Sequence, residues 1–319
     1  MRFLILYLLI TSFLLLGCVS HIPTPLEKKQ PKTKCTISDL KSSAEEQFLE
    51  KVDEKKDETG EKRVALVIGN GNYKFLEKLR APIDDAEDMT DSLTKLGFSV
   101  ICVLNATSEV MTKSLEKFEE KLDENTLALF YFSGHGGQNE RAESLLFPID
   151  FIPPDKKDTL DTLDEKEKHL LKISKVVDEM NESGSSKKLI IVDACRKKLE
   201  FEGNIKQGLG GSNDFLGMKG FFVAYATAPG TTAEGIDDGC SDSNTEDAND
   251  TDPNKCHSLY TKHLLNNIFN TESIYSMFEK VRASILDKAP DQQIPWESSS
   301  LKETLYLVPR PSYPYGGFQ

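Results

Sequence analysis

The sequence predicts an α/β fold in which a mostly parallel sheet lies between layers of helices. Short, almost uninterrupted apolar runs recur along the chain, for example at 64–68, 127–132 and 188–192. Such runs are typical of strands that are buried on both faces. Between them lie segments whose apolar side chains repeat every three or four residues, which indicates amphipathic helices. Strands that alternate with helices favour a parallel sheet covered on both sides.

The expected elements follow from these two patterns, taken in chain order from Arg63. Residues 84–96 carry acids in the first turn and end at Gly97, as a helix does. The predicted strands are 64–68, 98–104, 127–132, 145–150, 188–192, 221–227 and 304–308, and the predicted helices are 84–96, 111–122, 173–180, 258–268 and 274–285. The folded domain is therefore expected to cover residues 63–309, followed by a C-terminal tail at 310–319.

The first 18 residues are expected to be a signal peptide rather than part of the fold. Arg2 precedes an apolar run over residues 3–16, a charged start and short apolar core typical of secretory signals. The run is too short to span a membrane comfortably. Leu15-Leu16-Gly17-Cys18 resembles the bacterial lipobox, whose cysteine is acylated. We expect an exported bacterial lipoprotein, anchored through Cys18 on the periplasmic or cell-surface side; an ordinary signal peptide is the alternative.

The composition of the remaining N-terminal stretch predicts its structure, and the net charge of the chain limits the classes of partner. Residues 19–62 are rich in Lys, Glu, Pro and Thr and are predicted to be a flexible tether. The net charge of -13 at pH 7 disfavours nucleic acid as a partner and favours a basic ligand, unless it serves only solubility.

Export affects the interpretation of the cysteines. Cys240 and Cys256 flank an acidic insertion at 239–256, and in an oxidising compartment they could pair and close that loop. Cys102 lies in an apolar strand and is interpreted as a small buried hydrophobic residue. Cys35 is left without a predicted partner.

Two of the predicted strands are followed by candidate catalytic residues. Cys195 follows the strand 188–192, and His135, between Gly134 and Gly136, follows the strand 127–132. Ligands bind beyond the carboxyl ends of parallel strands. If these strands are parallel neighbours, a thiol and an imidazole meet at one edge, as a nucleophile and its base require. The alternatives are a buried structural thiol and a surface histidine in a tight turn.

A family resemblance is carried by these same segments. Tyr131-Phe132-Ser133-Gly134-His135-Gly136, followed by Asp193-Ala194-Cys195-Arg196, resembles the caspase-like cysteine peptidases, in particular their bacterial metacaspase-like (orthocaspase-type) members. Further matches lie at 65–70, 84–86, 225–230 and 293–296, so the resemblance covers roughly Arg63 to Val308. It implies a three-layer αβα sandwich with a six-stranded, mostly parallel sheet, and a cysteine endopeptidase.

The resemblance also implies roles for individual residues. Cys195 attacks the scissile carbonyl and His135 transfers the proton, as a dyad without a third member. The backbone N–H groups of Gly136 and Cys195 are expected to form the oxyanion hole. No cofactor is required for this chemistry. Calcium activation occurs among metacaspase relatives, but the acidic stretch 237–252 has no recognisable ligand spacing, so no metal site is predicted.

Specificity is predicted from the positions that line the pocket for the residue before the scissile bond. The positions at which caspases bind aspartate hold Leu79, Gly235 and Asp193 here, and none of these suits a carboxylate. Metacaspases use two acids, which match Asp85 and Asp193, and two carboxylates suit Lys or Arg. The expected partners are thus protein or peptide substrates with a basic residue. Alternatively, Asp85 only stabilises a helix N-terminus and Asp193 only orients a loop.

Two other functions stay open at this point. One is a catalytically silent binding or scaffold protein with the caspase fold. The other is a caspase-like peptidase that prefers an acidic residue or Asn before the scissile bond.

Overall fold

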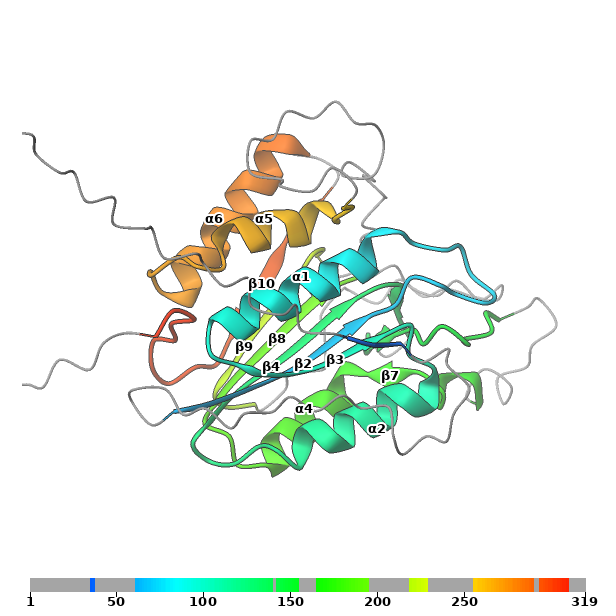
Figure 1. Ribbon diagram of the computed structural model, residues 1–319, viewed down its shortest axis with the longest axis horizontal. Helices are drawn as coiled ribbons and strands as arrows, with labels where there is room; N and C mark the ends of the chain where they lie inside the picture. The colour runs from blue at the N-terminus through cyan, green and yellow to red at the C-terminus, as the bar shows by residue number, and fades with distance from the viewer. Residues whose placement is uncertain are drawn as a thin grey trace, which may run out of the picture. The chain divides into compact units, whose positions relative to one another are not determined.

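The computed structural model describes residues 35–37, 61–139, 142–154, 165–194, 218–228, 255–289 and 293–309. All of them belong to the second of two parts of the chain, Thr33–Gln319. A seven-stranded sheet forms the centre of this part, in the order β1-β3-β2-β4-β8-β9-β10 (Figure 1). In chain order its strands are β1 (Thr36–Ile37), β2 (Lys62–Gly69), β3 (Ser99–Leu104), β4 (Thr126–Ser133), β8 (Lys187–Asp193), β9 (Phe221–Tyr225) and β10 (Trp296–Ser299). Neighbouring strands of this sheet are parallel, except for the antiparallel pair β9 and β10.

Helices cover both faces of the sheet and produce the predicted three-layer sandwich (Figure 1). On one face lie α1 (Ala81–Lys95), α5 (Leu259–Asn267) and α6 (Ile274–Lys288), and on the other lie α2 (Ser108–Glu119) and α4 (Ile173–Glu182). Alternate residues of the central strands supply the two cores: Val67 packs with the α1 side and Ile68 with the α2 side. The uninterrupted apolar run 64–68 is fully buried for this reason.

Most predicted elements are confirmed, with shifts of a few residues at their ends. The helix predicted at 84–96 is α1, which starts earlier because Pro82 fits the first turn of a helix. The helices expected at 111–122 and 173–180 are α2 and α4, and the strand expected at 145–150 is the short β6 (Ser144–Leu146).

The prediction of a last strand at 304–308 is wrong. The edge position is taken by β10, which pairs with β9 from Trp296 to Ser299. Leu305 and Leu307 are both buried, so the apolar alternation in the sequence reflects real burial. Their carbonyl groups, however, accept hydrogen bonds from the Ile274 N–H and the Arg63 guanidinium instead of a strand.

The predicted tether contains part of the sheet, and the interpretation of two cysteines is corrected. Cys35 forms a disulfide with Cys102, across a sequence separation of 67. The bond joins the start of β1 to β3, its parallel neighbour. Cys102 is therefore not a free hydrophobic side chain, and Cys35 is not left over. A pairing between chain segments so far apart leaves no local sequence pattern.

A second, three-stranded sheet lies next to the carboxyl ends of the main strands. It consists of β5 (Gly136–Gln138), β6 and β7 (Leu171–Lys172), all antiparallel. A small apolar cluster supports this region, formed by Tyr73, Leu145, Phe147, Phe151 and Leu170. Because β5 begins directly after His135, this sheet fixes the direction in which the chain leaves β4.

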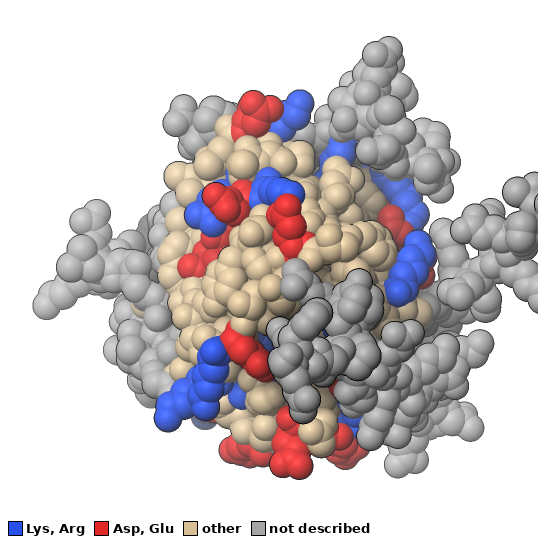
Figure 2. Space-filling view, turned by 90° about the vertical axis from the view of Figure 1, so that its left-hand side faces the viewer, with Lys and Arg blue, Asp and Glu red and all other residues tan. Residues whose placement is uncertain are grey.

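The described residues show a surface of mixed charge and helices too short or too polar for a membrane span. On the face drawn in Figure 2, Lys and Arg side chains lie close to Asp and Glu side chains, without a broad area of one sign. None of the described helices is both long enough and apolar enough to traverse a lipid bilayer.

Candidate active site

The carboxyl ends of β2, β4 and β8 lie side by side at one edge of the sheet. In the parallel register Gly69 is the partner of Ser133, and Ser133 is the partner of Asp193. The pairing continues beyond the strands, because the Asn70 N–H donates to the Ser133 carbonyl (2.9 Å) and the Gly134 N–H donates to the Asp193 carbonyl (3.1 Å). This is the edge at which open α/β sheets bind ligands.

The two residues predicted to form the dyad follow these strand ends at the same offset. His135 stands two positions after Ser133, and Cys195 stands two positions after Asp193, the register partner of Ser133. Cys195 itself lies outside the described residues. The structure thus confirms that the two strands are parallel neighbours, whereas the contact between thiol and imidazole stays a prediction.

The imidazole of His135 is held from two directions. Its ring nitrogen Nε2 lies 2.9 Å from the carbonyl oxygen of Glu77, and its backbone N–H donates to the Tyr73 hydroxyl oxygen at 2.7 Å. The rings of Tyr73 and His135 also pack against each other, with centroids 4.6 Å apart. The loop between β2 and α1 therefore fixes both the backbone and the ring orientation of His135.

These contacts determine which nitrogen of His135 is basic. A carbonyl oxygen only accepts hydrogen bonds, so Nε2 must carry a proton and Nδ1 keeps its lone pair in the neutral ring. Burial lowers the pKa of His135 below its ordinary value, although the Glu77 carbonyl opposes the shift. At neutral pH the ring is consequently a neutral base with Nδ1 as the accepting atom.

Glycine is required immediately before His135 because the backbone is crowded there. A Cβ on Gly134 would lie 2.6 Å from the Tyr73 hydroxyl and 3.0 Å from the Asn70 carbonyl. The hydroxyl cannot retreat freely, since it also donates to the Phe147 carbonyl (3.2 Å). The buried side chain of Asn70 holds the same loops, through hydrogen bonds to Ala106 and Phe147.

Asp85 and Asp193, the two predicted pocket acids, are brought together but are deeply buried. Asp85 is 0% exposed and Asp193 is 8% exposed. The Ser133 hydroxyl donates to Oδ2 of Asp85 at 2.9 Å. Ser258 connects the two acids, because its N–H donates to Oδ1 of Asp85 (3.2 Å) and its hydroxyl donates to Oδ2 of Asp193. The Thr261 hydroxyl donates to the same oxygen of Asp193 at 2.6 Å.

Burial affects the charge of both acids. Burial raises the pKa of Asp193 to about 7, and the negative charge of Asp85 adds to this shift. Burial likewise raises the pKa of Asp85, against the opposing hydrogen bond and charge of His257. Buried carboxylates are costly unless they are paired or hydrogen-bonded. The donors from the start of α5 therefore hold two acids that would otherwise repel each other.

His257 is a part of this site that the sequence did not reveal. Its Nδ1 lies 3.0 Å from Oδ1 of Asp85, and its Nε2 lies 3.1 Å from Oδ2 of Asp88. Lys255 forms a further ion pair with Asp88. Burial lowers the pKa of His257, but the hydrogen bonds and charges of Asp85 and Asp88 outweigh it and raise the pKa to about 9.

Sequence reasoning missed Tyr73, Glu77 and His257 for different reasons. Glu77 acts through its backbone carbonyl, which any residue type supplies. Tyr73 comes shortly after the predicted strand 64–68, and a hydroxyl so close to a strand end is the one signal that could have been noticed. His257 lies far from Asp85 in the chain, and only the fold brings the two together.

Other predicted site residues are placed only in part. Gly136 is the first residue of β5 and pairs with Leu146, and its role as an oxyanion donor stays a prediction. Cys256 forms a disulfide, while its predicted partner Cys240 lies outside the described residues. The same holds for Cys18, Gly235, the signal segment 1–18, most of the insertion 239–256 and the tail 310–319.

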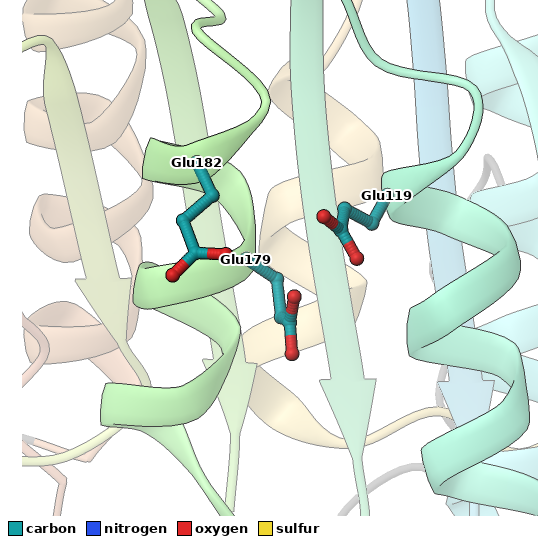
Figure 3. Close-up of side chains that lie close together, drawn as sticks. All are labelled: Glu119, Glu179 and Glu182. Carbon is teal, nitrogen blue, oxygen red and sulfur yellow. The ribbon is translucent and has the colours of Figure 1, made fainter.

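One cluster of acids lies at the opposite end of the sheet. Glu119 at the end of α2 and Glu179 and Glu182 near the end of α4 have carboxylate oxygens within 4.8 Å of one another (Figure 3). Burial and the neighbouring Glu119 raise the pKa of Glu179. Both helix ends precede strands of the sheet, so the cluster is remote from His135 and does not form part of the candidate site.

Comparisons with known proteins agree with this architecture. The family model described as "Caspase domain" matches residues 62–306. Human mucosa-associated lymphoid tissue lymphoma translocation protein 1 is 29% identical over 143 residues, which is 45% of this chain and 16% of the human protein. Caspase-1-B of Xenopus laevis is 26% identical over 329 aligned positions, which cover 92% of this chain and 77% of that protein.

The relatives differ in how much of them this chain matches. The chain spans 16% of the length of the human translocation protein and 17% of its mouse homologue. Among solved structures, caspase-1 from Spodoptera frugiperda has a TM-score of 0.52 at 18% identity, covering 79% of this chain and 92% of that chain. This likeness shows the fold.

Proposed function

Because the chain belongs to the caspase-domain family of cysteine peptidases, we propose that it is an endopeptidase that cleaves proteins or peptides after Arg or Lys. In this proposal Cys195 is the nucleophile, His135 transfers protons, and Asp85 and Asp193 recognise the basic side chain. No cofactor takes part in the reaction.

The observation that supports the dyad most directly is the shared offset at the strand ends. Ser133 and Asp193 are register partners on neighbouring parallel strands, and His135 and Cys195 follow them by equal distances along the chain. Neighbouring strands lie about 4.8 Å apart, so two side chains that follow paired residues start close together. Nδ1 of His135, the nitrogen that keeps its lone pair when Nε2 is protonated, is the atom that would accept the thiol proton.

The reaction then runs through a thioester. Nδ1 of His135 takes the proton of the Cys195 thiol, and the sulfur attacks the carbonyl carbon before the scissile nitrogen. The oxyanion accepts hydrogen bonds from the N–H groups of Gly136 and Cys195. The C–N bond breaks as His135 gives its proton to the leaving amine. Water, whose proton passes to His135, attacks the thioester, releases the new carboxylate and restores the thiol.

The preference for Arg or Lys rests on the charge of the pocket residues. Two acids lie side by side beneath the strand ends, connected by Ser258. A guanidinium or ammonium group supplies the opposite charge, whereas a carboxylate would add a third negative group to a buried site. Because the pKa of Asp193 is about 7, basic substrates should bind better as the pH rises above neutrality and this acid ionises.

A cleavage profile tests the proposal. Fluorogenic peptides that differ only in the last residue, Arg, Lys, Asp or Asn, are incubated with the full-chain protein. We expect release from the Arg and Lys peptides, because only these side chains compensate the pocket acids. The Cys195→Ala variant should release nothing while its melting temperature stays near that of the unchanged protein.

Each other outcome of the profile has a definite meaning. Cleavage after Asp or Asn but not after Arg or Lys would contradict the pocket assignment while leaving the cysteine peptidase in place. If none of the peptides is cleaved and an alkylating chloromethyl ketone does not label Cys195, the chain is a silent binding protein.

A further inference from the structure

The proposed cation pocket already contains a basic side chain of the protein. His257 immediately precedes the N-cap of α5, and its side chain is 10% exposed while that of Asp85 is 0% exposed. The imidazole lies between Asp85 and Asp88, with one ring nitrogen against each carboxylate, at 3.0 and 3.1 Å. An imidazole that donates to two carboxylates carries protons on both nitrogens and is therefore a cation.

The surroundings of His257 favour this charge. A raised pKa of about 9 keeps the ring protonated at neutral pH. The titratable groups around it come from three elements: Asp84, Asp85 and Asp88 from α1, Asp193 from β8, and Lys255 from its own segment. Acids outnumber bases in this group, so a positive ring is stabilised there.

The oxygens of Asp85 have little capacity left for a substrate. Oδ1 accepts from the His257 ring and from the Ser258 N–H, and Oδ2 accepts from the Ser133 hydroxyl. A carboxylate has about four acceptor sites. A guanidinium that binds Asp85 in a bidentate manner needs two of them. It therefore has to displace one of these three donors, and the ring of His257 is the one that carries a charge and can lose it.

We propose that His257 is a specificity-determining residue, whose imidazolium competes with the basic side chain of the substrate for Asp85. The inference rests on the function proposed above, because it presupposes a substrate cation in this pocket. The ring acts as an intramolecular competitor, so a higher concentration of an Arg or Lys substrate is needed to fill the pocket. Loss of its proton, or its removal, frees Asp85 for the substrate.

Kinetics of a neutral replacement test the competition. His257→Asn keeps an amide N–H near Asp85 but cannot carry charge. With a peptide ending in Arg, we expect the KM of the full-chain protein to fall about tenfold between pH 7 and pH 10, as the ring loses its proton. The KM of His257→Asn should already be low at pH 7 and should fall by only about twofold up to pH 10, as Asp193 completes its ionisation. Its kcat should stay within about twofold of the unchanged protein.

A matched control separates this effect from a general effect of histidine replacement. His169 is exposed and lies outside the site, so His169→Asn should keep the KM and the pH profile of the unchanged protein. If His257→Asn has an equal or higher KM at pH 7, the ring does not compete with the substrate and the proposal is overturned.

A binding measurement tests the competition without any turnover of substrate. Agmatine carries the guanidinium of arginine and serves as the probe. Competition is reciprocal, so saturating agmatine should lower the pKa of His257, followed by NMR, by about one unit, which is a tenfold weaker proton affinity. The resonance is identified by its loss in His257→Asn.

The outcomes distinguish failure of this inference from failure of the proposed function. If agmatine binds and the titration of His257 does not change, the competition is refuted and the basic pocket stands. If agmatine binds neither the unchanged protein nor His257→Asn, the pocket does not take a cation, and both proposals fall. Binding to His257→Asn alone supports the competition.

Discussion

Gly134 is the residue whose replacement should disturb the site most directly. Its missing side chain makes room for the Tyr73 hydroxyl, which holds the backbone of His135. In Gly134→Ala the new Cβ would lie 2.6 Å from that hydroxyl, so the loop must move. We expect a loss of about 1–3 kcal/mol in the free energy of unfolding and a large loss of kcat/KM, measured by urea denaturation and peptide cleavage.

Gly184 provides the control for this substitution. It has a φ of +75° and open space around the position of a Cβ. Gly184→Ala should therefore cost only the price of a left-handed backbone, about 1 kcal/mol, with cleavage unchanged. Equal effects of the two substitutions on cleavage would refute the role assigned to the crowding at Gly134.

Among single residues, the sequence reveals the functional candidates that belong to a short, contiguous motif. His135 follows an apolar strand between glycines, and Asp85 and Asp193 stand beside recognisable segments. His257 has no such local signal, because its partners Asp85 and Asp88 belong to a helix that is distant in the chain. The charge of a side chain buried by tertiary contacts cannot be inferred from its sequence neighbours.

Among the elements, the start of α5 has two functions that can be separated. Ser258 caps the helix by accepting from the Thr261 N–H at 2.9 Å, and its hydroxyl also donates to Asp193. Ser258→Ala should cost about 1 kcal/mol of stability. It should also raise the KM for an Arg peptide several-fold, because Asp193 loses a donor that favours its ionised form.

The start of α6 supplies the comparison. Ser273 caps that helix by accepting from the Ser276 N–H at 3.2 Å, and its hydroxyl lies 3.2 Å from the Ser276 hydroxyl. Ser273→Ala should lose a similar amount of stability, measured by denaturation, and leave the KM unchanged. A similar rise of KM in both variants would mean that the KM follows stability rather than the bond to Asp193.

Helices and strands could be predicted where the spacing of buried apolar residues matches the repeat of the secondary structure. The run 64–68 is apolar throughout because β2 is covered on both faces, and α4 has its apolar residues Ile173, Val176, Val177 and Met180 on one side. The prediction for 304–308 was wrong because Leu305 and Leu307 are buried in an irregular segment that belongs to no strand. Period alone does not distinguish the two cases.

For the whole molecule, the Cys35–Cys102 disulfide should contribute much of the stability. Closing a loop with a sequence separation of 67 is worth roughly 4 kcal/mol in the chain-entropy model. A variant with both Cys35→Ser and Cys102→Ser should lose about this amount in urea denaturation. Reductant is a poorer test, because Cys256 also forms a disulfide. A loss below about 1 kcal/mol would show that the unfolded chain gains little freedom.

The same bond decides where a pulling force would enter the fold. Tension applied at Cys35 from its N-terminal side passes through the sulfur atoms into β3. β2, which leads into Asn70 and the loop that holds His135, lies within the covalent ring that the disulfide closes, so this load does not run along its backbone. While the bond is intact, such a force acts on the candidate site only indirectly, through the hydrogen bonds and packing that join β3 to β2.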